Sequence, residues 1–416
     1  MSMFQLSSIV ITLVALFGYL NHKLIKLPDS IGITAIGLVA SVAIAFVGKL
    51  MPEVTVWAER TVQAVDFPET VFHGLLGFLL FAGSLHINLA DIAKEKWVIG
   101  ILATAGVVLS TFIVGAGMYL TSLALGLRLE FIYCLLFGAL ISPTDPIAVL
   151  AVLRKLGVPK SLETQIAGES LFNDGTGVVA FLTLLGIATA GHSEPPNAIA
   201  ILLAREVLGG IAVGLAVGIL GFSMLKGVDG YPIEIMITLS MATAGYAFAE
   251  FVHVSAPIAA VVMGLLIGNQ GRQFAMSEST RQHLFSFWEL LDELLNLLLF
   301  GLIGIEIVAL TITSTHLIVA IIAIPVVLVA RLLSVALPLT AMRPFLGSGQ
   351  RALAIMTWGG LRGGISVALA LTLPQFEGRD ILISATYGVV IFSILVQALT
   401  IGRLVRAWTA KHTLSA

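Results

Sequence analysis

Two acidic residues stand in the middle of apolar stretches of membrane length, which suggests binding and release of a cation or a proton inside a membrane. Asp145 lies in the sequence SPTDP at 142–146, and Asp174 lies in GESLFNDG at 168–175. A carboxylate near the centre of a bilayer costs about 2.5–3.5 kcal/mol even on the lenient insertion scale. Because a chain that carries two such residues is expected to use them, both aspartates are candidate site residues.

The neighbours of the two aspartates add oxygen atoms of the kind that hard cations prefer. Ser170, Asn173 and Asp174 occupy positions i, i+3 and i+4, so a helix here presents them on one face. Thr144 and Asp145 can add a hydroxyl and a second carboxylate. We predict an ion- and proton-binding site, with Na⁺ held at Asp174, Asp145, Ser170 and Thr144 and with Asn173 beside them.

Other charged residues within the apolar stretches need partners, since an unpaired buried charge is very costly. Glu169 precedes the predicted face and points toward a different neighbour, and Arg331 and Arg362 lie within predicted spans. We expect Glu169 to form a structural ion pair with Arg331 or with Arg362. The other arginine would balance helix ends near the site, and Asp145 itself has the alternative role of capping such helix ends.

The composition excludes a soluble protein. Of the 416 residues, 58% are hydrophobic and 11% are charged, whereas soluble domains carry about 25% charged residues. The net charge of −2 offers no basic surface for nucleic acid, and a single cysteine, Cys134, excludes a disulfide framework. We predict an all-α polytopic membrane protein, with residues 1–416 forming a single transmembrane domain.

About thirteen apolar runs are long enough to span the bilayer as helices. The connection 48–70, with Trp57 among charged residues, is predicted to lie at the membrane interface. The predicted spans lie at 4–20, 28–47, 71–90, 97–124, 131–153, 163–190, 197–225, 232–252, 255–269, 287–310, 316–339, 352–373 and 380–405.

Two of the predicted helices are interrupted near their centres. The helix at 131–153 carries Pro143 and Pro146, and the helix at 352–373 carries WGGLRGG at 358–364. Proline removes a backbone donor, and glycine is a poor helix former. Unwound backbone at this depth is tolerated only where it is buried in protein or lines a cavity, so the two breaks mark the predicted site.

A weak internal repeat supports the same interpretation. The sequence LLFAG at 79–83 resembles LLFGL at 298–302, which pairs predicted helices 1–6 with helices 8–13. Because the offset of seven helices is odd, the two halves have opposite orientation, and the two interrupted helices fall in corresponding positions. Inverted repeats with broken helices at the ion site recur in secondary transporters.

The placement of Lys and Arg predicts the orientation, because cytoplasmic loops are rich in these residues. An N-terminus outside and a cytoplasmic C-terminus place most of them in the cytoplasmic loops and tail. The basic residues that this orientation leaves outside are Lys49, Arg60, Arg128 and Arg379.

Three motifs, in this order, closely resemble those of bacterial sodium/proton antiporters of the NhaP type. They are SPTDP at 142–146, GESLFNDG at 168–175 and GGLRG at 359–363, and the resemblance covers about residues 5–405. The family of monovalent cation:proton antiporters to which these proteins belong also contains the animal sodium/hydrogen exchangers.

The resemblance implies a fold of thirteen helices in two bundles, with the two broken helices crossing at mid-membrane. A scaffold and dimerisation bundle would comprise 4–90 and 197–310, and a core ion-transport bundle would comprise 97–190 and 316–405. Carried over by motif, Asp174 is the acid that binds the ion and the proton, and Glu169 pairs with Arg331. The site is completed by Asn173, Ser170, Thr144 and Asp145.

The function implied by the resemblance is secondary active exchange of Na⁺ or Li⁺ for H⁺ with alternating access, in which cation and proton compete for Asp174. Asparagine at position 173 implies electroneutral exchange. Ala82 stands where some relatives carry a glutamate, so any ion ligation by that glutamate is absent. The resemblance further implies a role in pH regulation, a homodimer in the inner (plasma) membrane of a bacterium, and no cofactor beyond the transported ions.

The sequence is also compatible with other functions. The same residues would serve K⁺/H⁺ exchange or a broad monovalent cation/H⁺ exchange, and a passive cation channel would lack proton coupling. An intramembrane aspartyl protease could use Asp145 and Asp174 as a dyad, although their sequence contexts do not resemble protease motifs and the broken helices would be unexplained. We expect no enzyme activity.

Overall fold

The chain is helical almost throughout. The computed structural model describes residues 2–190, 196–310, 313–341 and 350–410, and in these ranges the backbone forms helices joined by short turns. Nine helices in the described ranges are long and apolar enough to cross a membrane. The prediction of an all-α polytopic membrane protein is confirmed, whereas the count of about thirteen crossings and the inverted repeat stay predictions.

Two compact units make up the chain. Unit 1 comprises Met1–Val71, Ala105–Glu163 and Asn296–Ala416, and unit 2 comprises Phe72–Thr104 and Thr164–Leu295. The division into a scaffold and a core bundle, implied by the family resemblance, stays a prediction.

Unit 1 contains both interrupted helices. Its helices are α1 (Met3–Leu20), α2 (Asp29–Gly48), α3 (Pro52–Gln63), α4 (Phe67–Glu69), α7 (Val107–Ala124), α8 (Phe131–Leu140), α9 (Ile147–Leu156), α17 (Ser314–Ala341), α18 (Gln350–Trp358), α19 (Gly364–Leu371), α20 (Arg379–Phe392) and α21 (Ala398–Ala410). Short π or 3₁₀ turns extend them at Asn21–Ile25, Ile307–Ala309 and Ser393–Gln397.

Unit 2 contains the helix that carries Asp174. Its helices are α5 (Leu76–Leu85), α6 (Leu89–Ile101), α11 (Pro196–Lys226), α12 (Tyr231–Ser240), α13 (Tyr246–Phe251), α14 (Ala256–Leu266) and α15 (Arg272–Phe274), with π turns at Met241–Gly245 and Ile267–Gly271. Four helical segments run from one unit into the other, namely α10 (Lys160–Ala190), α16 (Glu278–Glu306) and the π turns Thr70–Leu75 and Leu102–Gly106.

Local sequence explains where several helices begin and end. Ser2 and Gln5 form a reciprocal capping box at the start of α1. Gly157 ends α9 with a φ of +64°, a left-handed conformation that favours glycine. The connection 48–70, predicted to be interfacial, contains the helix α3, which packs against α2. Its position at a membrane surface stays a prediction.

Two predicted helix starts were wrong, because the helix predicted from 97 begins at Leu89 and the helix predicted from 287 also begins earlier. The apolar run begins at 287, but α16 begins at Glu278. The hydroxyl of Ser277 accepts a hydrogen bond from the Thr280 backbone N–H at 3.3 Å, which satisfies a donor of the first turn. The first turns of α16 are polar, so a search for apolar runs misses them.

Close contacts in unit 1 depend on glycine. Helix α8 packs against α7 where a methyl group on Gly138 would collide with the backbone carbonyl of Thr111, and α7 meets α17 where Gly117 faces Val326. Small residues let the backbones of membrane helices approach closely. Gly138 therefore fixes how near α8 lies to α7.

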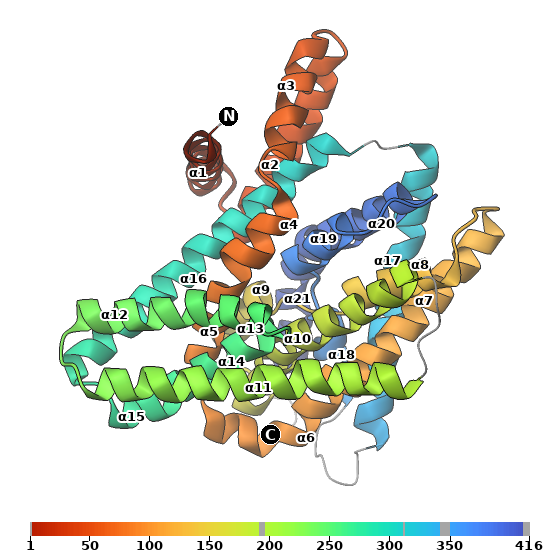
Figure 1. Cartoon of the computed structure of the whole chain (residues 1–416). Coiled ribbons are helices and arrows are strands. Elements are labelled where there is room, and N and C mark those ends of the chain that lie inside the picture. Colours follow the sequence, from red (N-terminus) through yellow and green to blue (C-terminus); the bar gives the residue numbers. More distant parts are fainter. Residues whose placement is uncertain (1, 191–195, 311–312, 342–349, 411–416) are drawn as a thin grey trace. The chain divides into compact units, whose positions relative to one another are not determined.

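Unit 2 is built around α14. Figure 1 shows α14 beside α11, and α14 also packs against α5. Gly264 on α14 faces Ser84 on α5, and Gly214 on α11 lies against the backbone of Ala259. These small residues on both sides of α14 hold three helices of unit 2 together by close packing.

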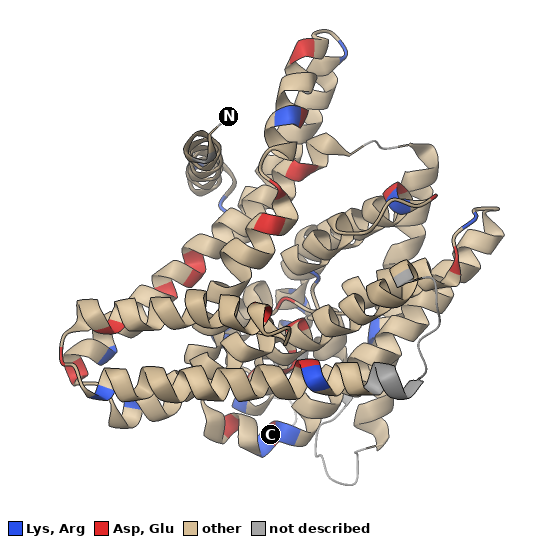
Figure 2. Cartoon of the chain, viewed as in Figure 1, with Lys and Arg blue, Asp and Glu red and all other residues tan. Residues whose placement is uncertain are grey.

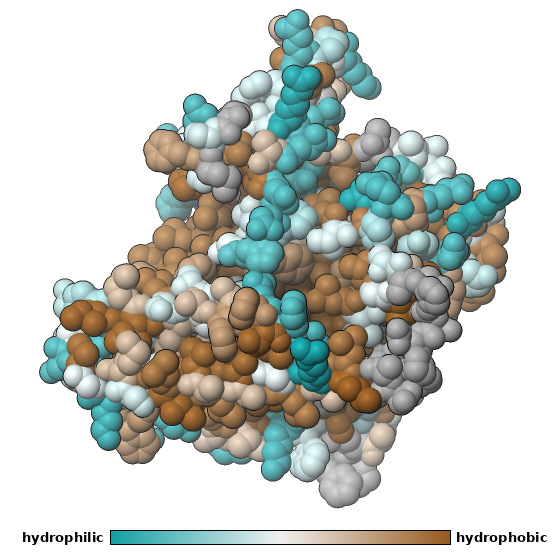
Figure 3. Space-filling model, viewed as in Figure 1, coloured by the Kyte–Doolittle hydropathy of each residue, from teal (hydrophilic) through white to brown (hydrophobic). Residues whose placement is uncertain are grey.

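Charged side chains are sparse on the helical surfaces, and Figure 2 shows long stretches with neither acidic nor basic residues. Large apolar side chains are exposed instead. Figure 3 shows a hydrophobic surface over α11 and α12, where Leu208, Leu220 and Met236 are each more than 60% exposed. An apolar exterior of this kind is suited to contact with lipid.

Candidate functional site

The predicted break between α8 and α9 is present. Helix α8 ends at Leu140 and α9 begins at Ile147, so the SPTDP sequence lies in non-helical backbone. Asp145 Oδ1 accepts a hydrogen bond from the Ile147 backbone N–H at 3.0 Å. Asp145 therefore caps the start of α9, which is the alternative role suggested for it by the sequence. This hydrogen bond does not use Asp145 Oδ2.

The predicted break between α18 and α19 is also present, and it meets the first break. Helix α18 ends at Trp358 and α19 begins at Gly364. The backbone N–H of Asp145 donates to the Leu361 carbonyl at 2.9 Å in an isolated antiparallel bridge. The crossing of the two broken helices is therefore a direct contact within unit 1.

Glycine allows this close approach at the crossing. A methyl group added to Gly363 would lie 2.7 Å from Asp145 Oδ2 and 2.9 Å from Asp145 Cβ. Real side chains do not approach so closely, so only glycine fits without a shift of the aspartate. Gly363 lets the second break pass directly over the carboxylate of the first.

The two buried arginines of unit 1 satisfy carbonyl groups at the breaks. Arg362, 2% exposed, donates from Nη1 to the carbonyls of Ser142 and Pro143, the latter at 2.9 Å. Arg331 donates from Nε and Nη2 to the Met356 carbonyl at 3.3 and 3.0 Å. The C-terminal end of a helix carries partial negative charge, and each arginine places a positive charge beside such an end.

A small cavity lies beside Asp145. Its volume is about 10 Å³, and its lining includes Asp145, Leu361, Arg362 and Phe300. This is close to the lower limit of roughly 10–15 Å³ for one water molecule. The hydroxyl-bearing neighbour Thr144 is 4% exposed, so unit 1 offers a carboxylate and a hydroxyl from a closely packed, non-helical segment.

The other predicted site residues lie on α10 in unit 2. Ser170 and Asn173 are each 1% exposed, and Asp174 is partly exposed. The helix is continuous through these residues, so the spacing i, i+3 and i+4 places the three side chains on one face. Glu169 is also buried, at 2% exposure.

The opposite side of α10 is fixed by packing within unit 2. Gly168 lies against Ile99 of α6, and the Thr176 hydroxyl donates to the Ala103 carbonyl at 2.5 Å. Gly175 faces Ile258 of α14. These contacts set the rotation of α10 relative to α6 and α14, and hence the direction in which the face that carries Asp174 points.

The predicted residues thus fall into two groups. The structure brings Thr144, Asp145 and Arg362 together at the crossing, with Arg331 on the neighbouring end of α18. The second group shares one helix, α10. A cation site that uses both groups stays a prediction, as does the pairing of Glu169 with Arg331 or Arg362. In the described residues, His, Cys, Asp and Glu side chains do not gather in any group of three or more that could hold a metal ion.

A buried glutamine that was not predicted from the sequence supports the second break. Gln397 is 3% exposed, and its Nε2 donates to the carbonyl of Trp358, the last residue of α18, at 3.0 Å. The Ser393 hydroxyl donates to Gln397 Oε1 at 2.7 Å, which orients the amide. The position of Gln397 as a polar residue within the apolar run 380–405 is the sequence feature that could have indicated this role.

Comparison with known proteins identifies the family. Residues 10–407 match the family described as sodium/hydrogen exchanger, transmembrane. The chain is 48% identical over 409 residues to the Na⁺/H⁺ antiporter NhaP of Pseudomonas aeruginosa, covering 97% of this chain and 96% of the relative. It is 34% identical over 393 residues to the Na⁺/H⁺ antiporter NhaH of Halobacillus dabanensis, covering 92% of this chain and 93% of the relative.

A solved structure has the same fold. The sodium proton antiporter MjNhaP1 of Methanocaldococcus jannaschii at pH 8 superposes with a TM-score of 0.75 at 19% sequence identity, covering 95% of this chain and 96% of that one. The match over residues 10–407 and the identity to NhaP over almost the full length together show that the chain belongs to the transmembrane sodium/hydrogen exchanger family.

Proposed function

We propose that this protein is a secondary active antiporter that exchanges Na⁺ or Li⁺ for H⁺ across a bacterial inner membrane. The observation that carries the proposal is the crossing of two broken helices at Asp145, in a chain whose relatives include Na⁺/H⁺ antiporters over nearly their full length. Irregular backbone at the middle of membrane helices is the usual place of an ion site in secondary transporters.

The proposed mechanism is competition between the cation and the proton for Asp174. Either ligand neutralises the carboxylate. One bundle then moves against the other, and only a neutralised site is carried from one side of the membrane to the other by this movement. The oxygens of Ser170, Asn173, Thr144 and Asp145 would replace part of the hydration shell of Na⁺. No further cofactor is required, because the gradient of one ion drives the movement of the other.

The two aspartates have different roles in this proposal. Asp145 Oδ1 is already engaged with the Ile147 N–H at the start of α9, which supports a role in holding the site together. Asp174, on the continuous helix α10 beside the neutral Asn173, is then the single acid that exchanges its ligand. One exchanging carboxylate is consistent with electroneutral exchange of one Na⁺ for one H⁺.

Three further features belong to the same proposal. The protein would form a homodimer, with its N-terminus outside and its C-terminus in the cytoplasm. Glu169 would pair with one of the two buried arginines of unit 1. The residues at 97–190 and 316–405 would form the moving core, and those at 4–90 and 197–310 the dimerising scaffold.

The test is exchange in proteoliposomes that contain a pH-sensitive dye and an acidic interior. Na⁺, Li⁺ and K⁺ are added outside in turn, and the Na⁺ and Li⁺ measurements are repeated with the membrane potential clamped by K⁺ and valinomycin. We expect Na⁺ and Li⁺ to dissipate the pH gradient whether or not the clamp is present. Dissipation by K⁺ alone would keep the mechanism and change the substrate.

The residue assignment is tested in the same assay by Asp174→Asn, for which we expect no exchange in folded protein. The matched control is Asp91→Asn, which removes a partly exposed acid of α6 that pairs with Lys94 at 3.2 Å, and this variant should exchange normally. Retained proton-coupled transport in Asp174→Asn would refute the role of Asp174. No cation-dependent response in the folded parent protein would refute the proposed function.

A further inference from the structure

A large apolar groove lies inside unit 2 between α6, α10, α11 and α14. Its volume is about 920 Å³, at the upper end of the range of roughly 300–1,000 Å³ for small-molecule sites. The walls are made largely of aliphatic and aromatic side chains such as Ile99, Phe172, Ile211 and Val262. A groove with these walls is suited to hydrocarbon.

The groove lies on the side of α10 away from Asp174. Phe172 and Thr176 line the groove, and Asp174 is two residues from each of them. Two residues correspond to about 200° around a helix of 3.6 residues per turn. Asp174 therefore points away from the groove, and the hydroxyls of Thr104 and Thr176, which line the groove, already donate to the carbonyls of Gly100 and Ala103.

The groove has one polar end, formed by α6 and by the π turn that follows α14. Lys96 and Gln270 are among its lining residues, and the Lys96 ammonium lies 5.6 Å from the ring centre of the exposed Trp97. Lys and Trp side chains are typical of the level of lipid headgroups at a membrane surface. Among the residues that the structure describes, no acidic side chain forms an ion pair with Lys96.

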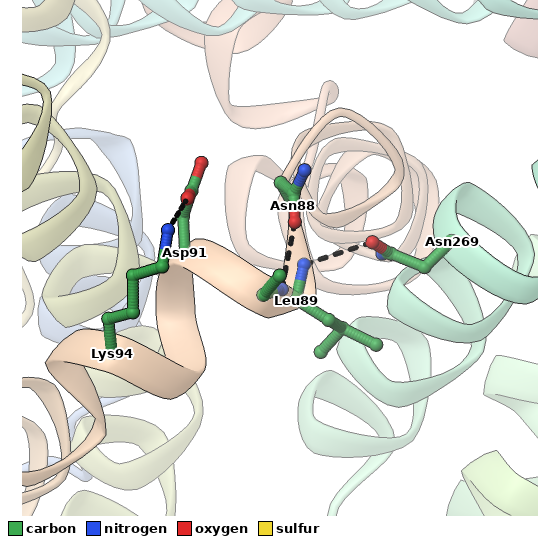
Figure 4. Close-up of polar contacts among 6 residues, drawn as sticks. Asn88, Leu89, Asp91, Lys94 and Asn269 are labelled. Atoms are coloured by element: carbon green, nitrogen blue, oxygen red, sulfur yellow. Dashed lines mark hydrogen bonds and ion pairs between the residues drawn. The ribbon is translucent and has the colours of Figure 1, made fainter.

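This end of the groove is held in place by hydrogen bonds, as Figure 4 shows. The Leu89 backbone N–H donates to Asn269 Oδ1 at 2.9 Å, which ties the start of α6 to the π turn that follows α14. Nearby, Lys94 donates to Asp91 at 3.2 Å. Lys94 is two residues from Lys96, so it lies on the opposite face of α6 and is already paired.

The part of the groove between Lys96 and Thr104 matches the depth of one lipid leaflet. From Lys96 to Thr104, both of which line the groove, the segment made of α6 and the π turn Leu102–Gly106 rises about 12 Å at 1.5 Å per residue. One leaflet contributes roughly half of the 30 Å hydrocarbon core. A ligand with its charge at Lys96 and its chains along the apolar walls would therefore have the dimensions of a phospholipid.

We propose that the groove binds an anionic phospholipid, with its acyl chains between α6, α10, α11 and α14 and its phosphate at Lys96. An unpaired basic residue at the polar end favours a negatively charged headgroup over a zwitterionic one. A free phosphate ion would leave the apolar walls without a partner. The bound lipid would support α10 from the side opposite to Asp174.

Headgroup selectivity is tested by native mass spectrometry of the purified protein titrated with phosphatidylglycerol or phosphatidylcholine. We expect the parent protein to retain phosphatidylglycerol preferentially, and Lys96→Gln to bind it about fivefold more weakly, because a basic residue near anionic lipid contributes about 1 kcal/mol. The matched control Lys94→Gln should keep the parent affinity. Equal retention of both lipids by the parent, or equal losses in the two lysine variants, would overturn the proposal.

The position of the acyl chains is tested by filling the groove. Gly100 lines the groove, and a Cβ atom added there would meet no atom within 4 Å, so Gly100→Phe should place its ring in the groove without straining the fold. We expect it to lower retention of phosphatidylglycerol at least fivefold. Gly186 of α10 also faces open space but does not line the groove, and Gly186→Phe should bind as the parent does. Unchanged retention in Gly100→Phe, with Lys96→Gln impaired, would mean adventitious binding of headgroups at the surface and would contradict the proposal.

Discussion

Arg362 is the residue whose loss should most weaken the crossing of the broken helices. Its guanidinium group donates to the carbonyls of Ser142 and Pro143, and it is 2% exposed. Replacement by glutamine removes the charged donor and leaves two buried carbonyls, each of which costs about 1–3 kcal/mol when unsatisfied. The two costs sum to roughly 2–6 kcal/mol. Because the shorter amide of the glutamine, or a water molecule, can reach one of the two carbonyls, we expect the free energy of unfolding to fall by about 3 kcal/mol.

The assay is thermal unfolding of the purified protein in detergent, with exchange in proteoliposomes measured in parallel. A matched control exists in Arg379, which also donates to two carbonyls at the end of a helix, those of Leu373 and Leu371 at 2.8 and 2.9 Å. Its side chain is 20% exposed, so water can replace it and Arg379→Gln should lose only about 1 kcal/mol. We expect Arg362→Gln to have the lower melting temperature and to lose exchange. Equal melting temperatures of the two variants would refute this reasoning.

Two other substitutions test single contacts. Gly363→Ala would place a methyl group 2.7 Å from Asp145 Oδ2. We therefore expect slower exchange and a loss of about 1–3 kcal/mol of unfolding free energy from overpacking. The control is Gly83→Ala, whose added methyl group meets nothing within 4 Å, and this variant should exchange and melt as the parent does. Thr280→Val removes the hydroxyl that donates to the fully buried carboxylate of Glu234, so we expect a loss of about 1–3 kcal/mol of unfolding free energy; a melting temperature equal to that of the parent would contradict the importance of this bond.

Much of the fold could be predicted because the membrane limits the alternatives. Apolar runs of sufficient length must be helices where lipid surrounds them. The two interruptions could also be predicted from the sequence. Pro143 and Pro146 have no backbone N–H to donate to a helical hydrogen bond, and the four glycines at 359–364 are poor helix formers. The start of α16 at Glu278 could not be predicted in this way, since its first turns are polar and are fixed by the cap at Ser277.

The particular carbonyls that the buried arginines contact could not be predicted, because backbone atoms leave no mark in the sequence. The sequence suggested that Glu169 pairs with one of the two arginines and that the other balances helix ends, and both Arg331 and Arg362 donate to carbonyls at the two helix breaks. Gln397 likewise serves the carbonyl of Trp358. A broken membrane helix must satisfy its freed carbonyls within the protein, so side chains that donate to them are a consequence of the breaks themselves.

Both aspartates lie within apolar stretches beside polar neighbours, and Pro143 and Pro146 already place Asp145 in an interrupted helix. The structure shows what this difference in backbone means for each aspartate. Asp145 stands in non-helical chain, where its N–H bonds to Leu361 and its carboxylate caps α9, so its position cannot change without loss of the crossing. Asp174 stands on an unbroken helix whose opposite side is packed against α6 and α14. A carboxylate on such a helix can change its ligand without any change in backbone hydrogen bonding, which is what exchange of a cation for a proton requires. Asp145 is therefore suited to holding the site together, and Asp174 is suited to exchanging its ligand.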